Sequence, residues 1–335
     1  NGSSGRAITL DGNSDLQPDL VWVKDKTDTE AHKLFNTISG ATKSVRSQDN
    51  SIEATVAEDL QSFDSDGFTV GNLLGWNESG NSLVAWCAKL GGAAVSNADG
   101  SVTSSVSVNT TLGMSVGTFT SADNLAKTIG HGLGVKPLMV IVKVTSTTDG
   151  WATWHTGLSS ASYKVRLNDT IAQLSVGDVS WNATEPTSSV FSVKSDGETG
   201  ATGRTFMFMA FAPSEYISIG SYEGNANANG TFVPTLNSAG VPLMPIWTLI
   251  KAIDSGGKPW VIHDAARDPD NVASNILFAQ ATTAEGTATS NYIDYVNGGT
   301  KIRTTDTQLN IASTLSYLTI GIPTIDVDGR ILAGR

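Results

Sequence analysis

Hydrophobic runs bounded by proline and lysine recur along the chain and predict buried β-strands. Each run begins with Pro, continues with mostly apolar residues and ends with Lys, at residues 18–24, 137–143 and 245–251. Proline suits the first residue of a strand, where no ladder N–H is needed. The β-branched and aromatic residues that follow favour a buried strand. We expect Lys24, Lys143 and Lys251 to mark the points where these strands leave the core for solvent.

Three further patterns follow each run in the same order, which indicates an internal repeat. The first is a block with two bulky rings and a polar last residue, the second a short apolar strand, and the third a strand that alternates large and small residues. The blocks are 32–36, 151–155 and 260–264, the short strands are 67–70, 190–193 and 299–302, and the alternating strands are 82–87, 205–210 and 316–321.

The repeat predicts an all-β fold of three tandem β-sandwich or jelly-roll-like units of about 100 residues each. We place the units at residues 1–90, 114–213 and 214–335, with 91–113 as a β-hairpin arm or linker. A further strand pattern, at 115–120 and 218–223, precedes a Gly/Asn-rich loop in the second and third units. The first unit starts inside the corresponding loop, so we expect its first strand to be missing from this sequence.

The linker contains the alternating segment 101–108, which predicts a strand with one exposed face. We expect it to lie at a sheet edge and to pair with the edge of a neighbouring chain. Val106 and Val108 are the residues of this candidate assembly strand.

Composition agrees with a β-rich protein and excludes several functional classes. The chain has 34 Gly and 16% charged residues, and Ser and Thr make up about a fifth of it. A net charge of -11 argues against nucleic-acid binding, because no basic face is available to release counterions. The one cysteine, Cys87, excludes an internal disulfide framework and multi-cysteine metal sites, and its strand position favours a small buried residue. Without a run of 18 apolar residues, we expect no membrane span.

Tryptophans are the first candidates for ligand contact. Those that recur within the repeat, such as Trp151, Trp154, Trp247 and Trp260, are assigned to the core, because each copy needs a large side chain there. Trp76 and Trp181 lie among polar loop residues instead. We therefore expect these two rings to be exposed and to contact a ligand.

No catalytic residue and no cofactor is predicted. His155 shares its repeat position with Asn36 and Asp264, which indicates a hydrogen-bonding site at a strand end and not a catalytic histidine. Asp64 and Asp66 lie in a short acidic loop beside Gly67 and are the first residues to test for Ca²⁺. No downstream Glu completes a calcium loop at the required distance, and Asx-turns account for the same residues.

Several of these motifs together resemble a family of uncharacterised proteins common in marine tailed bacteriophages. They are residues 2–9, 17–24, 32–40, 62–68 and 84–87, and the similarity covers nearly the whole chain. Members of that family are usually taken for virion structural proteins of tail-fibre or similar type. Ala88 departs from the pattern, since an aromatic residue is common at its position. The resemblance implies a location and carries over no catalytic or ligand residue.

The expected function is that of a non-enzymatic virion structural protein, a component of the tail, the fibre or the capsid exterior (a decoration protein), with a role in host attachment. Its partners would be other copies of itself, in a homo-oligomer such as a trimer, and other virion proteins. One alternative is a carbohydrate-binding module that recognises host surface glycan. Two further alternatives are a polysaccharide depolymerase, which would need paired carboxylates, and a subunit of a non-viral extracellular filament.

Overall fold

Antiparallel β-strands account for nearly all of the regular structure. The computed structural model describes residues 5–10, 12, 14–72, 77–287, 290 and 292–325. Within these residues the only helix is α1 (Thr307–Asn310), a single short turn. The predicted all-β sandwich class is therefore confirmed.

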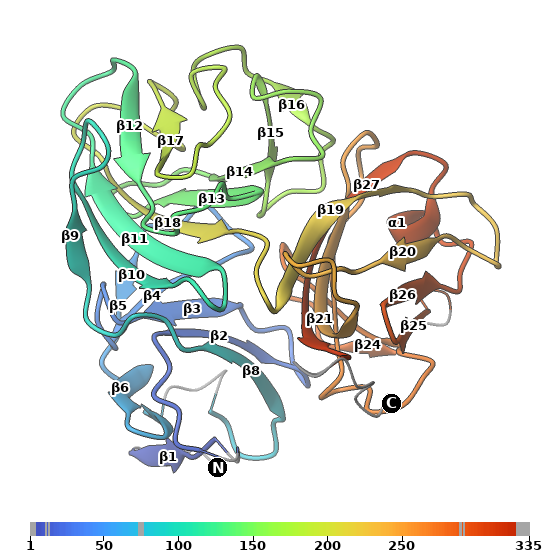
Figure 1. The fold of residues 1–335 in the computed structure, drawn as a ribbon. Coiled ribbons are helices and arrows are strands. Elements are labelled where there is room, and N and C mark those ends of the chain that lie inside the picture. The colour runs from blue at the N-terminus through green and yellow to red at the C-terminus, as the bar shows by residue number, and fades with distance from the viewer. Residues whose placement is uncertain are drawn as a thin grey trace.

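Three large sheets share one order of strands (Figure 1). The first runs β5 (Ala54–Thr55), β4 (Lys43–Val45), β3 (Lys33–Asn36), β2 (Leu20–Asp25), β8 (Leu83–Ala88). The second runs β16 (Leu174–Ser175), β15 (Tyr163–Arg166), β14 (Trp151–His155), β13 (Met139–Val144), β18 (Thr205–Phe211), β11 (Met114–Thr120), β10 (Ser104–Asn109), β9 (Val95–Asn97). The third runs β24 (Gly286–Thr287), β23 (Asn275–Phe278), β22 (Trp260–Asp264), β21 (Leu243–Ala252), β27 (Thr314–Pro323), β19 (Ile217–Glu223). We call β1–β8, β9–β18 and β19–β27 the first, second and third strand sets.

Each set adds a small sheet that packs on the outer face of its large sheet. These small sheets are β1 (Arg6–Ile8), β7 (Gly67–Val70) and β6 (Leu60–Asp64); β12 (Lys127–Gly130) and β17 (Val190–Val193); and β20 (Phe232–Pro234), β26 (Gly299–Ile302) and β25 (Ile293–Val296). Alternate residues of the long strands face this layer, so that Val21 and Val23 of β2 pack in one cluster with Phe68 and Val70 of β7. Each set is thus a sandwich of two unequal sheets.

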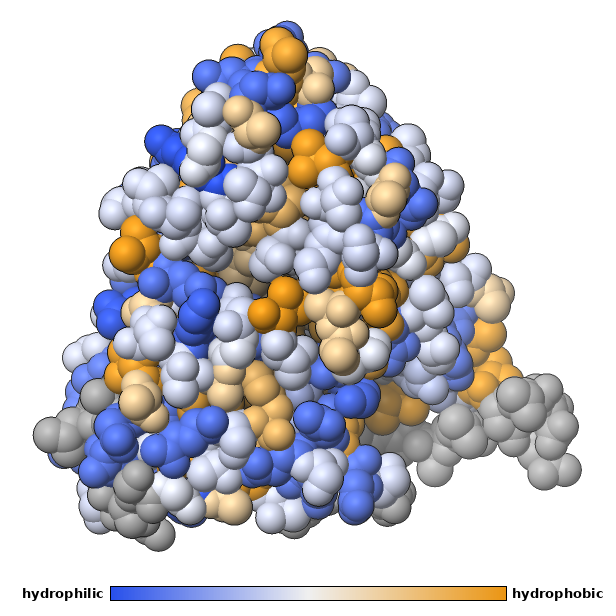
Figure 2. Space-filling model, turned by 90° about the vertical axis from the view of Figure 1, so that its left-hand side faces the viewer, coloured by the Kyte–Doolittle hydropathy of each residue, from blue (hydrophilic) through white to orange (hydrophobic). Residues whose placement is uncertain are grey.

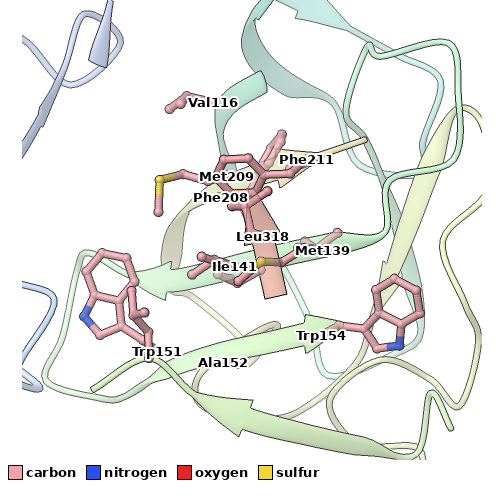
Figure 3. Packing of buried hydrophobic residues seen from close by; sticks show 14 of the residues in the cluster. Val116, Met139, Ile141, Trp151, Ala152, Trp154, Phe208, Met209, Phe211 and Leu318 are labelled. Carbon is pink, nitrogen blue, oxygen red and sulfur yellow. The ribbon is translucent and has the colours of Figure 1, made fainter. Parts of the chain in front are cut away.

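The inner faces of the three large sheets pack against one another and form one shared core. Residues from all three sets belong to it, including Trp22, Ile141 and Leu249 at corresponding positions of β2, β13 and β21. Figure 3 shows Leu318 of the third set lying beside Met139 and Ile141 of the second. The sequence predicted three tandem sandwiches joined by short links without predicting how they pack; in the structure the three sets surround a common centre (Figure 1). The reason is that both faces of the central strands are apolar, so both must be covered.

Corresponding backbone hydrogen bonds join each set to the next and close the ring. The N–H of Glu53 donates to the carbonyl of Thr145 at 3.1 Å, and that of Gln173 to Ile253 at 2.6 Å. The third bond returns from the last set to the first, from Glu285 to Lys26 at 2.8 Å. Such head-to-tail contacts form a closed ring when the rotation between units brings the last unit back to the first.

Ring nitrogens at one position of the repeat make a second series of contacts between sets. The indole Nε1 of Trp151 donates to the carbonyl of Arg46 at 2.9 Å, and that of Trp260 to the carbonyl of Arg166 at 2.8 Å. His32 holds this position in the first set and faces the backbone of Phe278. His32 Nε2 completes no hydrogen bond there, so this contact is weaker than the two tryptophan hydrogen bonds.

The expected solvent position of the three lysines is wrong. Lys24, Lys143 and Lys251 have no exposed surface. Their ammonium groups donate to backbone carbonyls of the loops that follow, for example Lys143 to Asp149 at 2.6 Å and Lys251 to Lys258 at 2.8 Å. Loop carbonyls that point inward take the place of water, which makes burial of the charge tolerable.

The segment at 91–113, predicted as a β-hairpin arm or linker, contains an antiparallel pair of strands. Its strands β9 and β10 extend the second large sheet, and β10 pairs with β11 on one side and β9 on the other. The expectation that Val106 and Val108 form an exposed assembly edge is therefore wrong for Val106, which is buried and paired on both sides. Val108 lies beyond the last β9 pair and is half-buried against the shared core. The edge of this sheet is β9.

The contact between neighbouring sets predicts different effects for two buried tryptophans of β14. Trp151→Phe should lower the free energy of unfolding by about 1–2 kcal/mol more than Trp154→Phe, because only Trp151 donates a hydrogen bond to another set. Both substitutions remove the same atoms from buried positions, so Trp154→Phe controls for lost volume. Chemical denaturation of the two variants measures the difference, and equal losses would contradict the proposed contribution of the Trp151 bond.

Candidate functional site

A hollow of about 340 Å³ opens beside β8, where the three large sheets meet. All three strand sets contribute to its wall, which is mostly apolar. The lining includes Trp22, Trp86, Ala88, Met114, Phe211, Trp247 and Asp264. We call it the tryptophan hollow.

Three tryptophans from three different strands form one wall of this hollow. Trp22 of β2 meets Trp86 of β8 edge to face, with ring centroids 5.7 Å apart, and Trp86 meets Trp247 of β21 at 6.2 Å. Trp22 Nε1 donates to His32 Nδ1 at 2.9 Å, which fixes the acceptor nitrogen of that imidazole. Edge-to-face packing of this kind is favourable for aromatic rings and keeps them rigid.

One carboxylate lies in the wall, and its oxygens are already engaged. Asp264 Oδ2 accepts hydrogen bonds from Trp86 Nε1 at 3.0 Å and from Arg267 Nε at 2.6 Å. Its Oδ1 accepts the backbone N–H groups of Ala266 and Arg267. The guanidinium of Arg267 is buried, pairs also with Glu285 at 3.0 Å and lies 5.9 Å from the ring centroid of Trp86. Asp264 therefore holds the wall together and is poorly placed to accept a proton from a ligand.

The repeat position of Asp264 acts as the hydrogen-bonding site that the sequence predicts. In each set its side chain accepts the backbone N–H two residues further on. Asn36 accepts from Ile38 at 3.1 Å, His155 from Gly157 at 2.9 Å, and Asp264 from Ala266 at 3.1 Å. Amide, imidazole and carboxylate groups all serve here because the turn requires only an acceptor.

A second hollow, of about 430 Å³, lies on the other face of β8. We call it the outer hollow. Its lining joins β8 to the small sheet of the first set. It includes the apolar residues Val23, Phe68, Val70, Leu83 and Ala85 and polar residues such as Arg6 and Asn81. Strand β8 thus has a hollow on each face, and all six of its residues are half-buried.

Burial keeps the histidines of the large sheets neutral. It lowers the pKa of His32 and of His263 to about 3 and that of His155 to about 4. Burial also lowers the pKa of His131, against the effect of the Thr187 backbone. Neither ring nitrogen of His263 has a hydrogen-bond partner. A histidine that stays neutral near pH 7 and is closed off from solvent is suited to packing and not to proton transfer.

The ligand contacts expected from the sequence do not come together in a site. The expected exposure of Trp181 is wrong, since this ring is 2% exposed. Trp76 lies outside the described residues. Asp64 accepts hydrogen bonds from the hydroxyls of Ser62 and Thr69, and Asp66 accepts the N–H of Leu16. Across the described part of the chain, no group of three or more His, Cys, Asp or Glu side chains is placed to hold a metal ion.

Sequence reasoning missed both hollows because it assigned their residues to the core. Two signals were present in the sequence: the expected absence of the first strand of the first unit, and Ala88, which stands where the resemblance leads us to expect an aromatic residue. The strand register places Ala88 opposite Leu20, and the corresponding pair in the second set is Phe211 and Met139. Phe211 fills space that Ala88 leaves open. The same register corrects the expected alignment of Cys87, which corresponds to Ala210 and Thr319 and not to Gly321.

Comparison with known proteins places the chain in a family without assigning it an activity. Residues 1–321 match a family described as a domain of unknown function, DUF7483, and the chain belongs to that family. No curated protein matches the chain, and neither does any solved structure. Among the helices of the described residues, none has the length and apolar character needed to cross a membrane.

The buried histidines predict a loss of stability in mild acid. Below pH 6.5 the unfolded chain binds protons at His32, His155 and His263 that the folded chain does not, so stability falls as the pH falls. The expected loss between pH 6.5 and 5.0 is about 1.5 kcal/mol for each histidine. Urea denaturation at the two pH values measures it. His263→Phe, which copies Phe35 at the same repeat position, should remove one histidine's share, and an unchanged pH dependence in this variant would contradict the assignment.

The buried lysines predict that stability also rises with pH in mild alkali. Burial lowers the pKa of both Lys143 and Lys251 to about 8, so above pH 8 the unfolded chain keeps protons that the folded chain releases. Stability should therefore rise between pH 8 and 9, by about 1 kcal/mol for each lysine. Lys143→Met should lose its share of the rise, whereas Lys43→Met, at a surface position, should keep the full rise. A fall in stability over this interval for the unsubstituted chain would contradict the expectation.

Proposed function

We propose that this member of the DUF7483 family is a non-enzymatic structural protein of the exterior of a bacteriophage particle, in the tail, the fibre or the capsid surface, with a role in attachment. The observation that carries the proposal is the closed arrangement of three sandwiches around one shared core. Such an arrangement is rigid, because central strands such as β2 and β13 are buried on both faces and each set is bonded to the next. An exposed particle component needs this rigidity to resist proteolysis while it presents broad surfaces.

The use of polar side chains supports a structural role. The histidines of the large sheets are buried and neutral, the three lysines of the central strands donate to backbone carbonyls, and Asp264 is occupied by an indole and a guanidinium. Active sites instead combine an accessible cleft with titratable groups poised near the working pH. These buried groups serve packing and hydrogen bonding.

The outer surface also fits a protein that works by contact. On the face in Figure 2, hydrophobic residues occur in small groups among polar ones. Partners in this proposal are other copies of the chain and other virion proteins. Regular copies of one chain on a particle assemble with closed symmetry, so we propose a homo-oligomer.

The glycan-binding alternative receives less support from the described residues. Trp181, one of its two expected contacts, is buried. The tryptophan hollow has suitable rings, but sugar hydroxyls need several free polar partners, and the carboxylate of Asp264 is already bonded. We therefore favour a structural role over sugar recognition.

Immunogold labelling of intact particles with an antibody to this chain tests the proposal. Gold at tail tips or fibres would support an attachment role, and gold over the head or along the tail shaft would support a decoration role. The control is the same antibody adsorbed with the purified chain, which should remove the label. If particles whose genome encodes the intact chain show no gold, the virion assignment is overturned.

A further inference from the structure

Among the described residues, strand β8 has an unpaired edge where the other two sets have a strand. In the second set, β18 lies between β13 and β11, and in the third, β27 lies between β21 and β19. Strand β8 takes the corresponding place beside β2, yet none of the described strands pairs with its other edge. An open edge of six residues in the middle of such a sheet leaves a ready template for another strand.

The pairing register shows which groups of β8 point outward. The N–H of Lys26 donates to the carbonyl of Ser82, so every second residue from Ser82 onward directs its backbone groups toward β2. The backbone N–H and C=O groups of Leu83, Ala85 and Cys87 therefore face away from β2. They offer three donors and three acceptors in a row to an incoming strand.

Both faces of this edge are hollow. The tryptophan hollow lies on the inner face against Trp86 and Ala88, and the outer hollow lies on the other face against Leu83 and Ala85. Because successive side chains of a strand point to opposite faces, one strand added to β8 would send alternate side chains into the two hollows. A single occupant thus accounts for the open edge and for both cavities.

Strands β11 and β19 show what such an occupant looks like. Both lie antiparallel to their partners and carry the same pattern, Met-Ser-Val-Gly-Thr-Phe in β11 and Ile-Ser-Ile-Gly-Ser-Tyr in β19. The aliphatic residues face the shared core, as Met114 and Val116 do. The aromatic residue faces the outer layer, where Phe119 packs against Phe191 with ring centroids 6.3 Å apart. Phe68, in the outer hollow, holds the repeat position of Phe191.

We propose that the outer edge of β8 binds an extended polypeptide strand with this pattern, antiparallel to β8 and supplied from outside the 335 residues of this chain. The two aliphatic side chains would lie opposite Ala88 and Trp86 and fill the tryptophan hollow. The Ser would lie opposite Cys87, and the aromatic side chain would lie opposite Leu83 and fill the outer hollow against Phe68. This inference goes beyond the proposed function, because it holds wherever the protein resides.

The structure also defines how the β8 site differs from its two templates. A Cβ added to Gly117 would lie 2.3 Å from the ring of Phe208, and one added to Gly220 would lie 2.9 Å from the hydroxyl of Tyr317. The residue of β8 at the position of Phe208 and Tyr317 is Ala85. The β8 site should therefore accept a larger residue at the glycine position, which the sites of β11 and β19 cannot.

Fluorescence anisotropy with a labelled peptide tests the proposal on the full chain. The peptide carries the β11 sequence, residues 114–120, between terminal lysines, and a scrambled peptide with the same lysines is the control. We expect saturable binding of one peptide per chain, at least tenfold tighter than the scrambled peptide. Replacing the peptide phenylalanine with alanine should weaken binding at least tenfold, whereas replacing its glycine with leucine should leave binding intact.

Peptide N-methylation tests the pairing without altering the protein. In the second set, Ser121 donates to Arg204 and Ala212 to Gly113, so the glycine of β11 directs its N–H toward β18 and the following threonine directs its N–H away. N-methylation of the peptide glycine should therefore weaken binding at least tenfold, and N-methylation of the next threonine should not. Equal effects of the two modifications, or equal binding of the scrambled peptide, would overturn the proposal.

A protein variant completes the test. Ala85→Pro removes one outward N–H from β8 and leaves the pairing with β2, a position where an edge strand tolerates proline. It should abolish peptide binding while circular dichroism and the melting temperature stay close to those of the unsubstituted chain. Light scattering tests the alternative that β8 pairs with a second copy of the chain. The proposal fails if the chain self-associates, Ala85→Pro separates the copies and the peptide does not compete with this association. None of these readouts depends on particle labelling, so the two proposals can fail separately.

Discussion

The packing of three sheets against one another by their inner faces is the constraint on which the rest of the structure depends. A central strand such as β2 or β13 is buried on both faces, since every residue of each is buried. One face is covered by the small sheet of its own set, and the other can be covered only by the neighbouring sets. The chain therefore closes into a ring of three sets. Several features lie where neighbouring sets meet: the tryptophan hollow, the buried lysines and the indole hydrogen bonds of Trp151 and Trp260.

Burial of polar groups follows from the same closure. Lys143 and Lys251 sit at joins between sets, where an apolar side chain would leave inward-pointing carbonyls without donors. His155 fills a turn position that needs an acceptor and loses contact with water because the next set covers it: its Nε2 lies 3.2 Å from the carbonyl of Tyr317. The pH dependence of stability that these groups predict is thus a result of the architecture and needs no functional site.

Sequence patterns predicted the strands well and their surroundings less well. The apolar runs at 18–24 and 137–143 correspond to β2 and β13, and the acceptor role of Asn36, His155 and Asp264 followed from their chemistry alone. Periodicity reports whether a strand is buried, but it does not report what buries it. Lys24 and Trp181 were misplaced for this reason: carbonyls at the end of β2 and in the loop after it accept hydrogen bonds from the Lys24 ammonium, and Trp181, whose neighbours in sequence are polar, packs in the shared core. The two hollows lie beside the edge of β8 with which none of the described strands pairs. The repeat predicts a missing strand in the first unit, but no local pattern predicts the hollows beside it.

The bond from Glu285 to Lys26 joins the last set to the first, across most of the length of the chain. Contacts between residues so distant in sequence are entropically costly to form and tend to make folding slow. Until the third set is in place, the first two have inner faces that lack part of their cover, so neither can reach its full stability alone. The three sets should consequently gain and lose their structure together, as one cooperative unit, even though each is the size of an ordinary independent domain.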